Sequence, residues 1–387
     1  MTSTLRSRSA EPSCRPFVFV WENFGPMHVD RCEAVAEHFA GQREVIGIEI
    51  RGVSLTYSWA PTTAKGFRKV TLFPGSTKAI SRFWRLLALW RACAPYTQAD
   101  YFFCDYQTPE VFLTAVALRL LGRRVYVMND AKFDDKPRFL RWELAKSIAY
   151  WPYWGALVSG RRTREYLRFL RFSDARIAIG YDTLSIQRVR TLAGTEPAPD
   201  GGHFEGRHFT AIARFVQKKN ISTLLNAYAA YAHSVTDPRA LHLCGSGELE
   251  TALREQVSRL KLQDFVVFRG FIQSREIATT LANTLSLILP SVEEQFGLVV
   301  IEAQAMGVPV IFTPACGARD QLLRSGVNGF LVEADNPEGM AFFMKLIASD
   351  EALWRRLALG ALNAAPLGDV VHFVSSVEQL TATREYA

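Results

Sequence analysis

The sequence lacks the features that indicate a membrane-spanning segment, a signal peptide or a metal site. No apolar run is long enough to cross a bilayer, since even residues 111–121 are interrupted by Arg119. The apolar run at residues 17–21 is too short for the hydrophobic part of a signal peptide. The six cysteines form no CxxC pair and have no histidines at zinc-site spacing, so neither disulfides nor a structural metal are expected. We therefore expect a cytoplasmic protein with reduced thiols.

The second half of the chain has few basic residues compared with the first. Residues 1–200 contain 29 Lys or Arg and 19 Asp or Glu, a net charge of +10, whereas residues 201–387 contain 16 and 19, a net charge of −3. A basic half predicts contact with an anionic partner, such as a lipid surface or a phosphorylated acceptor. No recognisable nucleic-acid-binding module is present, so no nucleic acid is expected as a partner.

Short β-branched or aromatic runs alternate with longer segments of helical period along the whole chain. This alternation is typical of parallel sheets joined by crossover helices, and it predicts an α/β fold. In the first half, strands are expected at residues 17–21, 44–50, 69–73, 101–106, 124–128 and 156–160. In the second half, they are expected at 208–213, 240–245, 265–270, 285–290 and 309–313.

Residues 191–206 collect Gly, Pro, Thr, Glu and Asp with few apolar residues, which is the composition of a linker. They separate a predicted first domain, residues 1–190, from a second, residues 207–368. Residues 369–387 are expected to form a C-terminal helix that packs back toward the first domain. The prediction is two doubly wound, Rossmann-like domains facing each other across a cleft, where ligands of such sheets bind.

The most informative segment runs from residue 290 to residue 332. A polar loop carries Glu294, and a helix is expected to open at Gly297. Amides at a helix start favour a phosphate group there. Because Glu302 lies one turn further along, the two glutamates can hold hydroxyls on opposite sides of a diphosphate. Taken singly, each glutamate is better explained as an ordinary solvated residue.

Two cations precede the first helix of the predicted second domain. A strand is expected to end at Ala213 and a helix to begin near Asn220, with Arg214 and Lys219 in the connection. Cations reach a bound anion from such a connection, and Lys218 is an alternative to Lys219. Basic loop residues are usually just solvated, so this segment has weight only together with the previous one.

Together these segments resemble the donor-binding domain of the family 4 retaining glycosyltransferases, which have the two-domain GT-B fold. The resemblance covers residues 208–335. Its most specific element is the spacing E-x7-E at residues 294–302; R-x4-K at 214–219 and V-x-F-x-G at Val266–Gly270 accompany it.

The resemblance implies a role for each matching residue. Arg214 and Lys219 would neutralise the donor diphosphate, and Glu294 would bind the transferred sugar, completing the catalytic set. Glu302 would bind the ribose hydroxyls. The other donor contacts would come from the stretch Gly270, Phe271 and Ile272 beside the base, and from Phe296, Gly297 and Leu298 around the distal phosphate.

The chain departs from the family pattern at two places. Asn220 stands where many relatives carry glycine, a change that a helix start tolerates. Cys316, Gly317 and Asp320 stand where relatives often have a glycine pair and a later glutamate, so the contacts implied for that loop are less secure.

Three segments of the first half, residues 21–31, 129–138 and 179–183, look like the acceptor domain of a bacterial subgroup of the same family. Gly25 would let the backbone approach the diphosphate from the opposite wall. The alternatives for the polar residues are a helix cap for the histidine and a solvated loop for the aspartates. The expected acceptor contacts are His28, Asp130, Asp134 and Asp135.

The resemblance implies a retaining glycosyltransferase, of the hexosyltransferase type, in bacterial surface polysaccharide or glycolipid synthesis. Its substrates would be a nucleoside-diphosphate sugar and a glycan or lipid-linked acceptor. Neither a cofactor nor a metal is expected, because Arg214, Lys219 and the helix start can stabilise the leaving diphosphate. The alternatives are a sugar-nucleotide epimerase of the same fold and a non-catalytic nucleotide-sugar-binding protein.

Residues 78–91 predict a helix that could lie on the inner face of an anionic membrane, making the protein peripheral there. The alternative, at least as good for this helix alone, is that its apolar side packs on the first domain's own sheet. At 100° per residue the two kinds of side chain separate, with Lys78, Arg82 and Arg85 on one side and Phe83, Leu87 and Trp90 on another.

Overall fold

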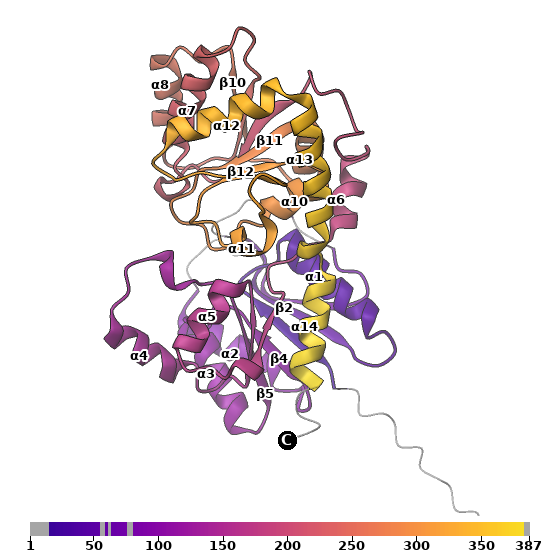
Figure 1. The fold of residues 1–387 in the computed structure, drawn as a ribbon. Helices are drawn as coiled ribbons and strands as arrows, with labels where there is room; N and C mark the ends of the chain where they lie inside the picture. The colour runs from indigo at the N-terminus through magenta and orange to yellow at the C-terminus, as the bar shows by residue number, and fades with distance from the viewer. Residues whose placement is uncertain (1–14, 55–58, 61–62, 76–79, 383–387) are drawn as a thin grey trace, which may run out of the picture.

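The chain forms two α/β domains, one above the other in Figure 1, each built on one parallel sheet. The computed structural model describes residues 15–54, 59–60, 63–75 and 80–382. The first sheet has the strand order β3-β2-β1-β4-β5-β6-β7, and the second has the order β10-β9-β8-β11-β12-β13. The predicted architecture, two doubly wound domains, is confirmed.

The strands of the first sheet are β1 (Phe17–Trp21), β2 (Val45–Arg51), β3 (Arg68–Phe73), β4 (Asp100–Phe103), β5 (Arg124–Asn129), β6 (Gly155–Val158) and β7 (Ile177–Ile179). Those of the second are β8 (His208–Ile212), β9 (Leu241–Cys244), β10 (Val266–Gly270), β11 (Thr284–Leu289), β12 (Val310–Phe312) and β13 (Gly329–Leu331). The sequence predicted every one of these except β7 and β13. Each of those two has only three residues and lies at the edge of its sheet, whereas the equally short β12 lies inside its sheet and stands in a longer apolar run.

The helices of the first half are α1 (Pro26–His38), α2 (Arg82–Cys93), α3 (Pro109–Leu120), α4 (Leu140–Ala149), α5 (Arg161–Phe169) and α6 (Ile186–Ala193). Those of the second half are α7 (Ile221–His233), α8 (Glu250–Arg259), α9 (Ser274–Ala282), α10 (Val299–Ala305), α11 (Arg319–Leu322), α12 (Pro337–Ser349), α13 (Glu351–Ala364) and α14 (Val371–Ala382). Short 3-10 turns include η1 (Phe133–Asp135) and η3 (Gln217–Lys219).

Helices cover both faces of the first sheet, which explains why its inner strand β1 is apolar and buried along its whole length. One face packs against α2, α3 and α5. The other face packs against α1 and α14. Phe373 and Val377 of α14 join the rings of Phe17 and Phe19 in a single apolar cluster. The last helix thus completes the core of the first domain, and Figure 1 shows it descending beside that domain.

The chain passes between the domains earlier than the sequence predicts. Helix α6, partly assigned to the first domain, packs through Ile186 and Val189 on the second domain's α9 and α10. Residues 191–206 are not a solvated linker either, because Ala198 and Phe204 are buried in the second domain's core. The polar composition of this segment suggested a linker, but two apolar side chains are enough to anchor it in the core.

Helix α2 does not present the cationic stripe that its sequence predicts. Arg85 turns inward and forms ion pairs with Glu22 and Glu110, both at 2.7 Å. Trp90 packs on the core of the first domain, as the alternative held, whereas Phe83 is exposed. Lys78 lies outside the described residues.

No helix within the described ranges combines the length and the apolar character that a span of the bilayer requires.

Candidate functional site

A cavity of about 620 Å³ lies between the two domains. It is lined by residues that follow the carboxyl ends of strands, such as Ala213 after β8 and Phe271 after β10 in the second domain, and Asp130 after β5 in the first. This is the edge of a parallel sheet where ligands are expected.

Arg214 and Lys219 reach this cavity from the connection between β8 and α7. Lys219 donates a hydrogen bond to Glu294, so a cation and a carboxylate meet at the cavity wall. Lys218 instead pairs with Glu293 at 2.7 Å, and it does not line the cavity. The structure therefore selects Lys219 over its neighbour.

The structure shows why asparagine is accepted at position 220, where many members of the family that the sequence resembles carry glycine. The backbone of Asn220 has φ +55°, a left-handed conformation that glycine adopts freely and asparagine tolerates better than most residues. Its side-chain amide donates to the carbonyls of Pro290 and Ala334. The residue thereby joins the connection carrying Lys219 to the loop carrying Glu294.

The loop before α10 holds Phe296, Gly297 and Leu298 at the cavity wall. Helix α10 begins at Val299, two residues later than predicted, because Gly297 has φ +98° and stands outside the helix. A Cβ atom there would lie 3.0 Å from the Cys316 sulfur. Glycine is thus required both by the backbone conformation and by this close approach.

Glu302 lies on α10 and faces the same cavity. Burial raises the pKa of its carboxyl to about 7, with Arg188 opposing the shift and Asp30 adding to it. Arg188 itself is held by Asp30 at 2.7 Å. At neutral pH this carboxyl is therefore poised between its ionised and neutral forms.

His28 occupies the facing wall, contributed by the first domain. Its Nδ1 accepts a hydrogen bond from the Gly25 amide at 2.9 Å, so it caps α1. Burial, and then the charge of Arg31, hold the pKa of His28 well below its ordinary value. A neutral ring that accepts at Nδ1 carries its proton on Nε2, and it can donate from there.

A partly buried carboxyl, Asp130, and a buried one, Asp182, complete the first domain's wall. Burial and the nearby charge of Asp182 raise the pKa of Asp130 to about 7. Burial also raises the pKa of Asp182 to about 6, although Arg31 donates to it at 3.3 Å and opposes the shift. All three residues line the cavity.

Asp134 and Asp135 lie outside the cavity and take part in contacts that hold its surroundings. Asp135 pairs with the buried Lys132, whose Nζ also donates to the Glu294 carbonyl at 2.9 Å. Asp134 pairs with Arg162 at 3.0 Å. These two aspartates support the walls of the cavity, and neither is placed to contact a ligand within it.

Most residues singled out in the sequence converge on this one cavity. Those that line it are Arg214, Lys219, Glu294, Phe271, Ile272, Phe296, Gly297, Leu298, Glu302, His28 and Asp130. Gly25 and Gly270 do not. A Cβ atom on Gly25 would lie 2.7 Å from the Trp59 ring, so the glycine makes room for a cavity residue.

Sequence reasoning missed several lining residues, chiefly Arg31, Trp59, Tyr181, Asp182 and Arg188. Two of the three first-half segments noted above contain three of them, Arg31, Tyr181 and Asp182. Nothing in a single sequence shows that residues about 150 positions apart, such as Arg31 and Asp182, will meet.

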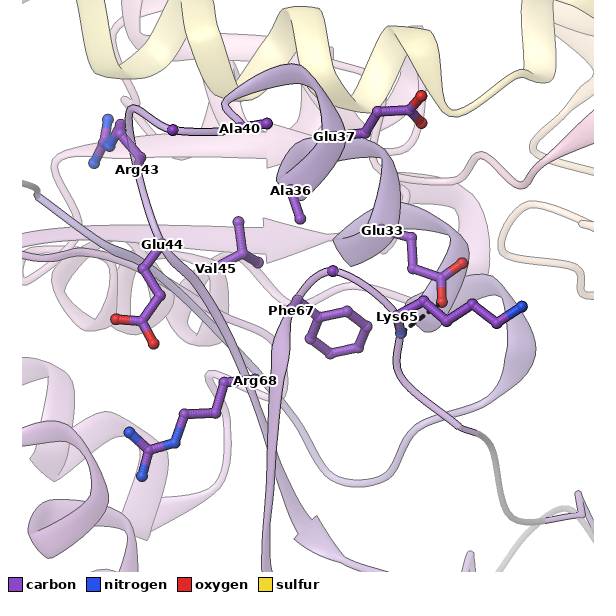
Figure 2. A pocket seen from close by; sticks show the side chains of 12 residues that line it. Glu33, Ala36, Glu37, Ala40, Arg43, Glu44, Val45, Lys65, Phe67 and Arg68 are labelled. Carbon is purple, nitrogen blue, oxygen red and sulfur yellow. Dashed lines mark hydrogen bonds between the residues drawn. The ribbon is translucent and has the colours of Figure 1, made fainter.

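A second hollow, of about 770 Å³, lies at the opposite, amino ends of β2 and β3. Figure 2 shows Glu33 and Lys65 on one side of it and Arg43, Glu44 and Arg68 on the other. Both signs of charge are mixed there and do not converge on one point. Within the described residues, no group of three or more His, Cys, Asp or Glu side chains is arranged to hold a metal ion.

Comparison with known families finds one match in the second domain. Residues 203–361 match the family described as glycosyl transferases group 1. Among curated proteins, the D-inositol 3-phosphate glycosyltransferase of Streptomyces avermitilis is 31% identical over 211 residues, which are 52% of this chain and 45% of that protein. The N-acetyl-alpha-D-glucosaminyl L-malate synthase of Bacillus anthracis is 32% identical over 146 residues, 38% of this chain and 37% of that protein. The chain thus spans less than half the length of these two relatives.

Solved structures resemble the whole chain. Sucrose-phosphate synthase from Thermosynechococcus elongatus has a TM-score of 0.72 at 18% identity and covers 95% of this chain and 98% of its own. The Anabaena protein HepE, solved with UDP and glucose, has a TM-score of 0.71 at 14% identity, with 95% and 100% covered. At such identities the likeness establishes the fold, and that fold is GT-B.

Proposed function

We propose that this chain, whose second domain belongs to the glycosyl transferases group 1 family, moves a sugar from a nucleoside-diphosphate sugar to an acceptor hydroxyl. One observation carries the proposal. Arg214 and Lys219, from one connection, line a single cavity with Glu294, from the loop before α10, and Glu302, from α10 itself; the first domain closes this cavity from the other side. Two cations beside two carboxylates suit a ligand with a diphosphate at its centre and hydroxyls at both ends.

The chemistry follows from where charge develops. Glycosyl transfer leaves positive charge on the sugar ring and negative charge on the departing diphosphate, and Arg214 and Lys219 are placed to stabilise the latter. The donor phosphate would share Lys219 with Glu294, freeing that carboxylate for the sugar hydroxyls. We assign retention of configuration, with the leaving phosphate oxygen taking the acceptor proton and no protein nucleophile.

The acceptor would lie against His28, Asp130 and Asp182. A neutral imidazole and two carboxyls with raised pKa values can donate to and accept from hydroxyls without placing a full charge there. We therefore propose a polyhydroxylic acceptor, a glycan or the sugar headgroup of a lipid, in surface polysaccharide or glycolipid synthesis. The reaction would take place in the cytoplasm, at or near the inner face of the membrane.

A thermal-shift panel of UDP-, GDP-, ADP- and dTDP-sugars tests the donor site. A ligand at about 100 times its dissociation constant adds roughly 2.7 kcal/mol of stability, so the correct donor should raise the unfolding temperature clearly. Lys219→Ala should lose that shift, and Lys218→Ala, one residue outside the cavity, should keep it. The absence of a shift with every sugar nucleotide would contradict the proposal.

A further inference from the structure

Helix α4 has its polar side buried and its apolar side exposed, the reverse of an ordinary helix in an α/β domain. Its one buried residue, Glu143, accepts hydrogen bonds from Tyr166 and from Lys146. Leu140, Leu144 and Ile148 recur every four residues and form one outward stripe, with exposed fractions of 67%, 53% and 74%. The helix thus has an apolar face that nothing in the described part of the chain covers.

Neighbouring aromatic residues widen this face. We call the exposed set the α4 patch; it comprises Phe139, Leu140, Trp142, Leu144, Ile148 and Trp151. A further exposed pair, Phe133 and Phe169, has ring centroids 5.5 Å apart. Arg138 ties this pair to the patch by donating to the Phe133 carbonyl at 2.9 Å. Figure 1 shows α4 at the edge of the first domain, on the opposite side from α1 and α14.

Cations stand among these apolar side chains. Residues 136–152 contain four Lys or Arg and one acidic residue, the buried Glu143. Lys136 and Arg141 are exposed, and neither forms an ion pair with any described residue. A hollow of about 450 Å³ beside the helix is lined by Lys136 and Lys146 together with Phe139 and Trp142.

We propose that the α4 patch binds the surface of an anionic lipid bilayer. Leucine, isoleucine and tryptophan on a helix that also carries Lys and Arg are the composition of a helix lying at a bilayer interface. The cores of protein–protein interfaces are instead depleted of Lys, which argues against a second copy or a protein groove as the occupant. The net charge of +10 over residues 1–200 adds long-range attraction to the same surface.

The position of the patch connects it to the cavity. The segment leading into α4 begins with Asp130 on the cavity wall and continues through Lys132, which donates to the Glu294 carbonyl. A bilayer touching α4 therefore lies on the acceptor side of the molecule. This location differs from the sequence prediction, which gave that contact to α2, whose Arg85 is engaged within the protein.

Vesicle flotation of the full chain tests the proposal. Vesicles of phosphatidylcholine, with and without an equal part of phosphatidylglycerol, are used in about 0.1 M and about 1 M salt, where the Debye length falls from about 10 Å to about 3 Å. We expect binding to the anionic vesicles in low salt and release in high salt. Leu140→Ser/Leu144→Ser/Ile148→Ser should weaken binding by roughly tenfold or more, because each side chain loses its apolar contact.

Two controls sharpen the test. Val327→Ser/Phe342→Ser/Leu359→Ser removes apolar side chains of the second domain that are each at least half exposed, and it should leave binding unchanged. Lys136→Glu/Arg141→Glu should weaken binding only in low salt. Unfolding temperatures of all variants, measured in parallel, identify any that are misfolded.

Several outcomes would overturn the proposal. The first is that the wild-type chain floats with neither kind of vesicle. The second is that the α4 triple variant floats like the wild type. The third is that the α4 triple variant loses self-association, measured by sedimentation, but keeps its lipid binding. Flotation needs neither donor nor acceptor, so its failure leaves the proposed transfer reaction standing. Failure of the sugar-nucleotide shift likewise leaves the α4 patch untouched.

Discussion

The two walls of the cavity differ in the charge of their polar side chains. On the second domain's wall, Lys219 meets Glu294 in an ion pair at the cavity surface, an arrangement that an incoming anion can rearrange. On the first domain's wall, Asp130 is partly buried and Asp182 is buried, and both have raised pKa values. The comparison teaches that an ion pair stands where a charged leaving group would form, whereas the carboxyls that would face the acceptor, like Glu302 on the opposite wall, have raised pKa values.

We call the second domain's side of the cavity the donor wall and the first domain's side the acceptor wall, after their proposed ligands. The largest expected effect comes from removing the cations of the donor wall. Lys219→Ala or Arg214→Ala should lower turnover by roughly 10² to 10³, by analogy with loss of one oxyanion donor. Steady-state kinetics with saturating acceptor measure this loss. Lys218→Ala is the matched control, because that lysine pairs with Glu293 outside the cavity. Near-normal turnover in both cavity variants would break the assignment of the diphosphate to this wall.

The acceptor wall should give a smaller and separable effect. Asp130→Asn should lower kcat/KM for the acceptor by roughly tenfold to a hundredfold, the cost of about 1.5–3 kcal/mol for a hydrogen bond to a charged group. Its affinity for the nucleoside diphosphate should not change. Asp134→Asn, outside the cavity, serves as control. A matching loss of nucleotide affinity in Asp130→Asn would show that the walls are not divided by substrate.

Asp130 should also set the pH dependence of transfer. If the ionised Asp130 accepts the acceptor hydroxyl, kcat/KM should fall as the pH drops through about 7, the value to which burial raises its pKa. In Asp130→Asn this limb of the pH profile should disappear. An unchanged profile in the variant would assign the limb to another group, such as Glu302, whose pKa is also raised to about 7.

Within the donor wall, the two glutamates should separate by roughly tenfold in nucleotide affinity. Glu302→Ala should weaken binding of the bare nucleoside diphosphate by about that factor, through a lost hydrogen bond. Glu294→Ala should leave this affinity unchanged or raise it, since it releases Lys219, yet it should damage transfer. Titration calorimetry distinguishes them, and equal losses in both variants would contradict the division.

The smallest effect should come from a contact that joins the two domains outside the cavity. Arg162 on α5 donates to Asp320 of the second domain at 2.7 Å and to the Pro314 carbonyl at 3.0 Å. A partly exposed pair of this kind contributes about 0–1 kcal/mol, so Arg162→Ala should lower turnover by no more than roughly fivefold. A loss as large as that of Lys219→Ala would show that this contact serves the chemistry itself.

The donor wall could be predicted from the sequence because its parts are local. Arg214 and Lys219 stand in one connection and Glu294 and Glu302 within one strand-loop-helix unit, so spacing alone relates each pair. The acceptor wall is assembled from residues far apart in the chain. Arg31 and Asp182 belong to different elements of the sheet edge, and only folding brings them to 3.3 Å.

The same distinction holds for the fold. Eleven of the strands have patterns of their own in the sequence, whereas β7 and β13 are defined only by the neighbours that they pair with. Helix α4 was not anticipated as an exposed apolar surface. Its periodicity resembles that of a buried helix, and only the structure shows that Glu143 is the residue facing inward.

The completion of the first domain's core by α14 has a consequence for the order of events during synthesis. Phe373 and Val377 fill the face of a sheet whose own last strand ends at Ile179, so about 200 more residues must be translated before that face can close. At about 5–20 residues per second, the ribosome needs roughly 10–40 seconds for them. During that interval α1 alone covers this face, and Phe19 lacks the Phe373 ring that packs against it, which makes this part of the chain a natural client for chaperones that bind emerging polypeptides.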